Sequence, residues 1–217
     1  MISEQTRKQL AALKISSVEP LIICDVDEVV VHFIREFEDF ISTEDLKLKH
    51  GNPAEPYVLY ENKTKKPVSL PRVSSLIDAF FEKCTRNMKP IIGAVEGLQT
   101  LNANASVVML TNLPHFAGDD RRANLADLGL DHPVITNSGP KGPAILDLAS
   151  RTKAPVVFID DSQNFIQSAY DHAPHVHLIH FLHDERFSKY VPKLEYVSLR
   201  TDNWVDVKAH MNILLKR

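Results

Sequence analysis

Two carboxylates follow an apolar stretch close to the N-terminus. The segment LIICDVDEVVVHF covers residues 21–33 and places Asp25 and Asp27 directly after four apolar residues. A strand with this composition is expected to be buried, and buried strands seldom end on paired acids. An isolated D-x-D pair is also typical of turn residues after a strand, so its meaning depends on the residues that accompany it.

Polar side chains also follow three later apolar stretches of strand length. They are Thr111 and Asn112 at the end of 106–112, Lys141 in the loop after 133–137, and Asp160 and Asp161 at the end of 155–161. In an open α/β sheet, ligands bind at the carboxyl ends of the strands. We therefore expect these residues to converge on one point together with Asp25 and Asp27.

The four carboxylates in this cleft need more positive charge than Lys141 supplies, because like charges at short range repel one another. A hard divalent cation is the natural complement, and Mg²⁺ typically takes one or two carboxylates together with phosphate oxygens and water. The Thr111 hydroxyl, the Asn112 amide and the Lys141 ammonium are donors suited to phosphate oxygens. Acids, metal and donors together indicate phosphoryl transfer with a carboxylate as covalent nucleophile.

Six apolar stretches of strand length alternate with helical patterns along most of the chain. The strand candidates cover 20–26, 106–112, 133–137, 155–161, 175–181 and 196–200. Their hydrophobicity is continuous, which is typical of strands covered on both faces in a parallel sheet. The helical patterns fall near 121–130, 144–149, 162–170 and 201–217. Ser162 is available as N-cap of the third of these helices. The sequence therefore predicts an α/β fold with a Rossmann-like parallel sheet core.

One long segment, residues 33–90, interrupts this alternation. It carries two helical apolar faces, of which the first contains Phe33, Phe37 and Phe40, and a polar, hairpin-like stretch at 50–71 separates the two. We expect the phenylalanines to pack inside this segment and not to form a ligand site. The predicted division is an α/β core of residues 1–32 and 91–217 and an inserted, mixed but mainly helical cap of residues 33–90.

The order of these elements resembles the haloacid dehalogenase (HAD) superfamily over roughly residues 21–169. That family carries four short motifs, each at its own structural place, and the four in this order are far more specific than any one alone. The matching segments are, in chain order, IICDVDEVV, VVMLTN, GPKG and VFIDDS. The insertion lies between the first two motifs, where this family carries its type 1 cap.

The resemblance implies a role for each motif residue. Asp25 would be the nucleophile that forms an aspartyl-phosphate. Asp27 would be the general acid that protonates the leaving oxygen and then the base that activates water. Thr111, with help from Asn112, would hold the phosphate, and Lys141 would screen the charge of the nucleophile and the phosphoryl group.

The resemblance also implies a metal site and a branch of the family. Mg²⁺ would lie between the Asp25 side chain, the backbone carbonyl of Asp27 and Asp161, with Asp160 close by. The founding dehalogenases of the family do not use a D-x-D pair, so the second aspartate points to the phosphatase branch.

Two positions depart from the family pattern. Glu28 stands where the family usually has glycine, and a bulky anion at that turn is expected to change its geometry and to face the cap. The downstream polar residue of the fourth motif falls at Phe165, which leaves Asn164 as the nearest polar substitute.

These observations predict a Mg²⁺-dependent phosphatase that hydrolyses a small phosphomonoester. Two alternatives stay open. A phosphomutase would use the same nucleophile but hand the phosphoryl group to a sugar, and a regulatory or binding protein would keep the fold without turnover. The sequence opposes the last alternative because every element of the catalytic set is present.

Composition limits the partners. The 217 residues carry a net charge of -3, which argues against a nucleic acid or an anionic membrane as the main partner. The N-terminal stretch MISEQTRKQLAALK lacks the apolar region of a signal peptide, and the chain contains two cysteines, too few for a disulfide scaffold. We expect a cytoplasmic protein whose partner is a small phosphorylated substrate.

Five histidines cluster in sequence near the fifth strand candidate, at positions 172, 175, 177, 180 and 183. His175 and His177 would share one face of a strand, as zinc ligands do. No cysteine or carboxylate completes a recognisable ligand spacing, so structural histidines at a sheet edge are the favoured interpretation.

Overall fold

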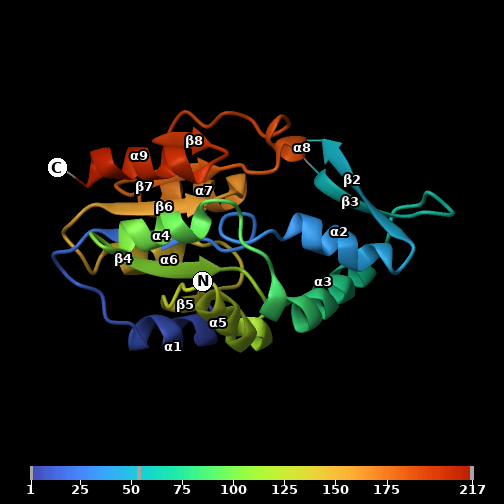
Figure 1. Ribbon diagram of the computed structural model, residues 1–217, viewed down its shortest axis with the longest axis horizontal. Helices are drawn as coiled ribbons and strands as arrows, with labels where there is room; N and C mark the ends of the chain where they lie inside the picture. Colours follow the sequence, from blue (N-terminus) through green and yellow to red (C-terminus); the bar gives the residue numbers. More distant parts are fainter. Residues whose placement is uncertain (1, 53–54, 216–217) are drawn as a thin grey trace.

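The computed structural model describes residues 2–52 and 55–215, and its main body is a six-stranded parallel sheet (Figure 1). The strand order is β5-β4-β1-β6-β7-β8. The strands are β1 (Leu21–Cys24), β4 (Ser106–Thr111), β5 (Val134–Thr136), β6 (Val156–Asp160), β7 (His177–Phe181) and β8 (Leu199–Thr201). This confirms the predicted α/β class, and it makes β1, β4 and β6, which precede most of the candidate site residues, direct neighbours.

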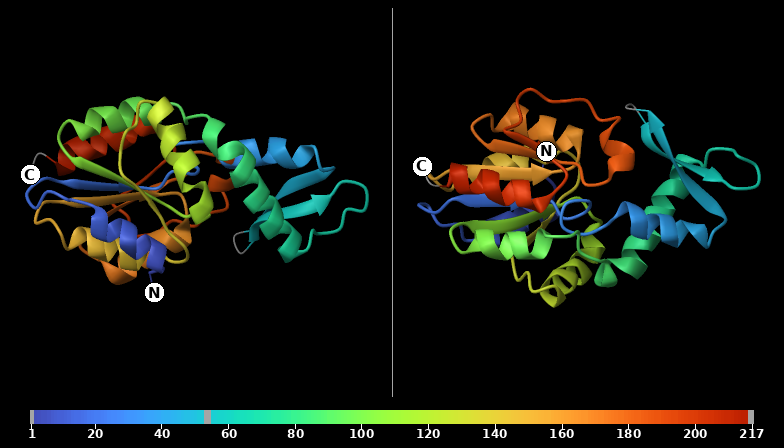
Figure 2. Two further views of the ribbon diagram at one scale, coloured as in Figure 1. Left: turned by 90° about the horizontal axis from the view of Figure 1, so that it is seen from below. Right: turned by 45° about the horizontal axis from the view of Figure 1, so that its top comes forward.

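Helices cover both faces of the sheet (Figure 2). The helices of the main body are α1 (Glu4–Ala12), α4 (Ala94–Asn102), α5 (Gly118–Asp127), α6 (Gly142–Ala149), α7 (Gln163–His172), the short α8 (Glu185–Ser188) and α9 (Trp204–Leu214). Along β1, Ile22 and Cys24 pack with α4, α5 and α9, while Leu21 and Ile23 pack with α1, α6 and α7. Both faces of the strand are thus apolar, which explains the continuous hydrophobicity of the sequence.

The last strand is displaced from its predicted position at 196–200. Tyr196 lies outside the sheet, where its ring stacks on Tyr170 with centroids 4.3 Å apart and its hydroxyl donates to Gln167 Oε1 at 2.6 Å. Tyr196 therefore covers α7, and backbone hydrogen bonding to β7 begins at Ser198, whose N–H donates to Leu178 O at 2.8 Å.

The segment at 33–90 lies beyond the carboxyl edge of the sheet (Figure 1). It contains α2 (Ile34–Ser42), an antiparallel hairpin of β2 (Leu46–Asn52) and β3 (Glu55–Glu61), α3 (Leu70–Cys84) and a 3-10 turn (Thr85–Asn87). The hairpin begins at Leu46, upstream of the predicted polar stretch. Leu46, Leu48 and Leu59 turn the buried face of the hairpin towards α2. This inserted segment, which we call the cap, is a mixed α/β unit.

The predicted phenylalanine stripe packs between α2 and α3. Ring centroids of Phe33, Phe37 and Phe40 lie 5.3, 5.4 and 5.7 Å from that of Phe80. The two chain crossings between cap and core also contact each other, because His32 N donates to Lys89 O at 3.0 Å and Ile91 N donates to Val30 O at 2.8 Å. Within the described residues, no helix is long and apolar enough to span a membrane.

Trp204, at the start of α9, supports the loop after β1. The indole Nε1 donates to the carbonyl of Val29 at 3.0 Å, and Trp204 is 1% exposed. Gly97 in α4 leaves room for the ring, since a Cβ at this position would lie 2.7 Å from Trp204 Cε3. A small residue in α4 is thus required so that the loop with Asp25 and Asp27 keeps its support.

The variant Gly97→Ala should lower the free energy of unfolding by about 1–3 kcal/mol, because the added methyl group would overpack a buried aromatic ring. Urea titration measures the effect. In the double variant Gly97→Ala/Trp204→Phe the loss should be smaller than the sum of the single losses, since the smaller ring removes the clash. If Gly97→Ala instead stabilised the protein, as alanine does in an open helix interior, the packing argument would be wrong.

Candidate active site

The ammonium of Lys141 lies between two buried carboxylates. Lys141 Nζ is 2.5 Å from Asp25 Oδ1 and 2.7 Å from Asp160 Oδ2. Asp25 follows β1, Asp160 ends the neighbouring β6, and Lys141 precedes the first residue of α6. Lys141 and Asp160 are fully buried and Asp25 is 5% exposed. The structure thus brings together three of the residues that the sequence placed in one site.

One ammonium cannot neutralise two buried carboxylates, and the pKa values reflect this. Burial raises the pKa of Asp25 to about 7; Lys141 opposes this rise, and Asp160 adds to it. Burial likewise raises the pKa of Asp160, again against the pull of Lys141. Burial acts to lower the pKa of Lys141, but the two carboxylates raise it above its usual range. The lysine therefore stays charged, and below about pH 7 the raised pKa of Asp25 favours a proton on the Asp25–Asp160 pair when no other cation is present.

Asp161 completes a group of three carboxylates. One oxygen from each of Asp25, Asp160 and Asp161 lies within 4.8 Å of the others. Burial, followed by repulsion from Asp160 and Asp25, raises the pKa of Asp161 well above its usual range. Three acids beside one ammonium form an oxygen-rich cluster with an excess of negative charge. Such a donor set fits a divalent cation of the Mg²⁺ type.

The N-terminus of α7 is organised by Asp160 and not by Ser162. Ser162 occupies the N-cap position, but its side chain makes no capping hydrogen bond. Instead its backbone N–H donates to Asp160 Oδ1 at 2.8 Å. Ser162 therefore occupies the predicted N-cap position, but its hydroxyl does not make the capping hydrogen bond. Asp160 thus holds Lys141 with one oxygen and the turn into α7 with the other.

Asp27 is anchored by a residue that the sequence did not reveal. Arg121 Nη2 lies 2.5 Å from Asp27 Oδ1, and the arginine side chain is fully buried in α5. The Thr111 hydroxyl donates to Asp27 Oδ2 at 3.4 Å. Arg121 lies in a run of four charged residues, DDRR, a pattern more typical of a solvated helix face. The sequence therefore carried no signal for this ion pair.

Asn112 joins the loops that follow β4 and β5. Its Nδ2 donates to Gly139 O at 2.8 Å, and its Oδ1 accepts from Asn137 Nδ2 at 2.9 Å. Gly139 has a φ of 79°, a conformation that favours glycine. Asn112 thus contacts the cleft and also fixes the loop that leads to Lys141.

A cleft of about 300 Å³ lies at the carboxyl edge of the sheet and is lined by part of the candidate site. Asp25, Asp27 and Asp161 lie on its polar side, together with Asn112. Cap residues supply the opposite wall, and Phe165 from α7 closes one flank; the cap residues are Phe33, Ile34, Ile77 and Phe81. Phe165 also faces the active-site lysine, with its ring centroid 4.8 Å from Lys141 Nζ. Asn164 is exposed, so the apolar Phe165 and not the amide contributes to the cleft.

Glu28, at the position where the HAD pattern usually has glycine, connects the loop after β1 to the cap. Its φ is 60°, the left-handed conformation that glycine adopts most easily. Its carboxylate accepts hydrogen bonds from the backbone of Phe33 at 2.8 Å and of Ile34 at 2.7 Å, at the start of α2. Burial raises the pKa of Glu28 to about 7, although these two N–H groups oppose the rise. The side chain thus faces the cap, as expected, and satisfies N–H groups at its first helix.

The histidines do not gather around a metal. Across residues 2–52 and 55–215, the group Asp25–Asp160–Asp161 is the one cluster of His, Cys, Asp or Glu close enough to share an ion. His180 is fully buried in β7, and its Nε2 lies 3.0 Å from Asp161 O, so that nitrogen carries the proton. Burial lowers the pKa of His180 to about 4 and keeps the ring neutral. His180 therefore supports the backbone of a site residue.

The raised pKa of Asp25 predicts a dependence of stability on pH in Mg²⁺-free buffer. The usual pKa is 3.8 and the folded value about 7, so the folded state holds the proton more tightly. This contribution is full below about pH 4 and is lost as the pH rises through 7. Between about pH 5 and pH 8, the free energy of unfolding of the wild type should therefore fall relative to that of Asp25→Asn. Denaturant titrations in buffer with EDTA measure both free energies. A rise of the wild-type value relative to that of Asp25→Asn over this range would contradict the proposed sharing of a proton.

Comparisons by sequence find no relatives: neither a protein-family model nor a curated protein matches the chain. Solved structures do match. A HAD family hydrolase from Deinococcus radiodurans R1, with bound phosphate and sodium, has a TM-score of 0.59 and 15% identity over 92% of this chain and 97% of that one.

Two further solved structures share this architecture. A HAD-type hydrolase from Bacillus subtilis bound to magnesium has a TM-score of 0.54 and 10% identity, over 90% of this chain and 99% of its own. An L-2-haloacid dehalogenase has a TM-score of 0.60 and 10% identity, over 89% and 99%. At these identities the likeness concerns the architecture, and on that ground this chain has the fold of the HAD-family hydrolases.

Proposed function

We propose that this protein is a Mg²⁺-dependent phosphatase that hydrolyses a small phosphomonoester through an aspartyl-phosphate on Asp25. The observation that carries the proposal is the contact of Asp25 Oδ1 with Lys141 Nζ at 2.5 Å, in a cleft that also holds Asp27 and Asp161. A buried carboxylate beside a permanent cation and a second, separately anchored carboxylate are the parts that a two-step displacement at phosphorus needs.

In the first step, the free oxygen of Asp25 attacks phosphorus, and the bond between phosphorus and the ester oxygen breaks. Asp27 donates a proton to the departing alkoxide, which leaves as the alcohol. Arg121 and Thr111 fix the two oxygens of Asp27 and so orient its side chain for this transfer. Lys141 lowers the repulsion between the Asp25 carboxylate and the phosphoryl oxygens.

In the second step, Asp27, now ionised, removes a proton from a water molecule whose oxygen attacks the phosphorus of the aspartyl-phosphate. The bond between phosphorus and Asp25 breaks, which returns the carboxylate and releases inorganic phosphate. The apolar cap wall of Phe33, Ile77 and Phe81 limits the access of bulk water to the cleft.

Asp25, Asp160 and Asp161 would hold Mg²⁺, which supplies positive charge to the nucleophile and the phosphoryl group when bound. The backbone carbonyl of Asp27 is a further proposed ligand. Two solved neighbours support this proposal indirectly, because one was obtained with bound phosphate and one with magnesium.

Dehalogenation is the second candidate, since L-2-haloacid dehalogenases are among the structural neighbours. The same Asp25 could displace a halide from carbon. A halide leaves without a proton, so Asp27 would have no proton to donate in this reaction. An alcohol leaving group, in contrast, needs a proton from a general acid. The paired aspartates therefore favour a phosphate ester, and assays on 2-chloro acids beside aryl phosphates separate the two.

The two aspartates should respond differently to substitution. Asp25→Asn should reduce turnover of any phosphate ester to background, because no other carboxylate is placed to replace the attacking oxygen. Asp27→Asn should slow alkyl phosphates by about 10²–10⁴-fold and p-nitrophenyl phosphate much less, since nitrophenolate leaves without protonation. Steady-state rates across a leaving-group series measure the contrast. Equal losses across the series for both variants would overturn the assigned roles.

The metal proposal predicts that Asp161→Asn raises the Mg²⁺ concentration needed for half-maximal activity at least tenfold. Calorimetric titration of Mg²⁺ provides a readout that does not depend on turnover. Asp131→Asn, an exposed aspartate before β5 at the opposite edge of the sheet, serves as the matched control. An unchanged Mg²⁺ affinity in Asp161→Asn would show that this carboxylate is not a ligand.

A further inference from the structure

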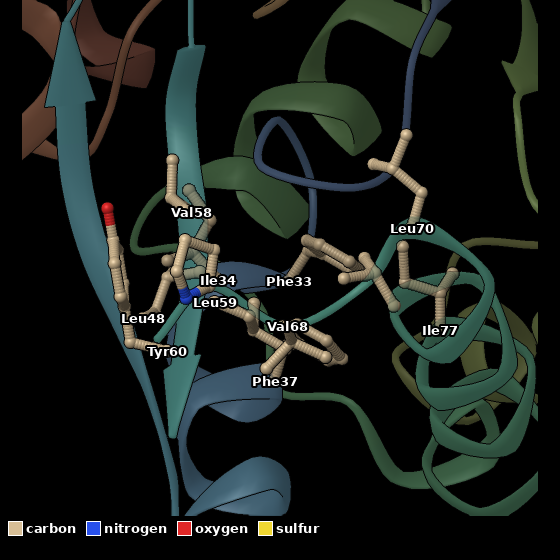
Figure 3. Close-up of a pocket in the computed structure, with 12 residues that line it drawn as sticks. Phe33, Ile34, Phe37, Leu48, Val58, Leu59, Tyr60, Val68, Leu70 and Ile77 are labelled. Atoms are coloured by element: carbon tan, nitrogen blue, oxygen red, sulfur yellow. The ribbon is translucent and has the colours of Figure 1, made fainter. Parts of the chain in front are cut away.

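The cap contains an apolar cavity of about 620 Å³, partly open to solvent, between α2, the hairpin and α3 (Figure 3). Figure 3 shows Leu48, Val58 and Leu59 of the hairpin on one side and Leu70 and Ile77 of α3 on the other, with phenylalanines between them. Its volume lies within the range of about 300–1,000 Å³ typical of small-molecule sites.

This cavity adjoins the catalytic cleft. Phe33, Ile34 and Ile77 line both spaces, so a single layer of side chains separates or connects them. Phe33 and Ile34 are also the residues whose backbone N–H groups bind Glu28, one residue beyond Asp27. A molecule with its phosphate at Asp25 therefore has the cap cavity as an adjoining apolar space for the rest of its structure.

The lining of the cavity selects against polar groups. Among the described residues that line it, none carries a charged side chain, and the Tyr60 hydroxyl is the one polar side-chain group. Sugar hydroxyls placed here would lose their water partners and gain almost none from the protein. An alkyl or aryl group, in contrast, would remove both its own surface and the cavity wall from water.

We propose that the cap cavity binds the apolar alcohol part of the substrate, so that the substrates are phosphate monoesters of hydrophobic alcohols. This inference rests on the proposed phosphatase function. The predicted phenylalanine stripe then has two tasks: Phe33 and Phe37 pack against Phe80 and also form part of the cavity wall.

A homologous series of n-alkyl phosphates, from methyl to octyl, tests the inference with Mg²⁺ present. The value of kcat/KM should rise by up to about fourfold per added methylene until the cavity is filled, because each buried methylene contributes a constant increment. Glycerol phosphate and sugar phosphates should stay near the methyl value. A flat series, or a preference for the polar esters, would overturn the inference while the phosphatase assignment stands.

Paired variants link the effect to the cavity. Leu70 and Val205 are 83% and 70% exposed and each lies in the first turn of its helix. Leu70→Asn should lower the octyl-to-methyl ratio of kcat/KM, whereas the matched control Val205→Asn on α9 should not. Val73→Phe adds bulk to the cavity wall, so kcat/KM should stop rising at a shorter alkyl chain than in the wild type. Equal ratios in Leu70→Asn, Val73→Phe and Val205→Asn would contradict the proposed location.

If no phosphate ester is hydrolysed, measurements of binding test the two proposals separately. Absence of turnover on every phosphate ester, p-nitrophenyl phosphate included, would refute the phosphatase function. Calorimetric titration of the wild type with the same alkyl phosphates then decides the inference by itself. Affinity that grows with chain length would support the apolar site, and affinity that does not would overturn it.

Discussion

The contact of one ammonium with two buried carboxylates is the constraint on which the rest of this structure depends. Lys141 lies 2.5 Å from Asp25 and 2.7 Å from Asp160, and all three are removed from water. An unpaired charge at this depth would be strongly unfavourable, so β1, β6 and the start of α6 must keep their relative positions. The third carboxylate, Asp161, leaves the group with excess negative charge, which the proposed cation would neutralise before a phosphoryl group binds.

The catalytic loop and the cap form one connected unit. Glu28 accepts two hydrogen bonds from the start of α2, and Trp204 holds the carbonyl of Val29 from the opposite side. On the far side of α2, Glu38 pairs with Arg186 at 2.8 Å. A movement of the cap therefore acts on the loop that carries Asp27. The apolar cavity and the acidic cleft share walls for the same reason, because both are built around the first turn of α2.

Much of the site could be predicted from the sequence because its signals are local. Continuous apolar stretches that end in Asp25, Thr111 or Asp160 fix both the strand and its polar end, and a parallel sheet then brings those ends together. Arg121 could not be predicted, because its burial depends on how α5 packs against the loop that contains Asp27. The role of Glu28 depends on the placement of α2. The cavity is set by the packing of the hairpin against two helices and has no sequence pattern of its own.

The proposed mechanism requires that Asp25 carries the phosphoryl group covalently. Acyl phosphates react with borohydride, which converts the aspartyl side chain to a homoserine side chain. Rapid quenching of the Asp27→Asn variant with p-nitrophenyl phosphate and Mg²⁺, followed by reduction and peptide mass spectrometry, locates the modified residue. Covalent catalysis by Asp25 predicts that residue 25 is converted to homoserine only when substrate is present, and that no conversion occurs in Asp25→Asn. Modification at another residue, or turnover without any trapped intermediate, would contradict it.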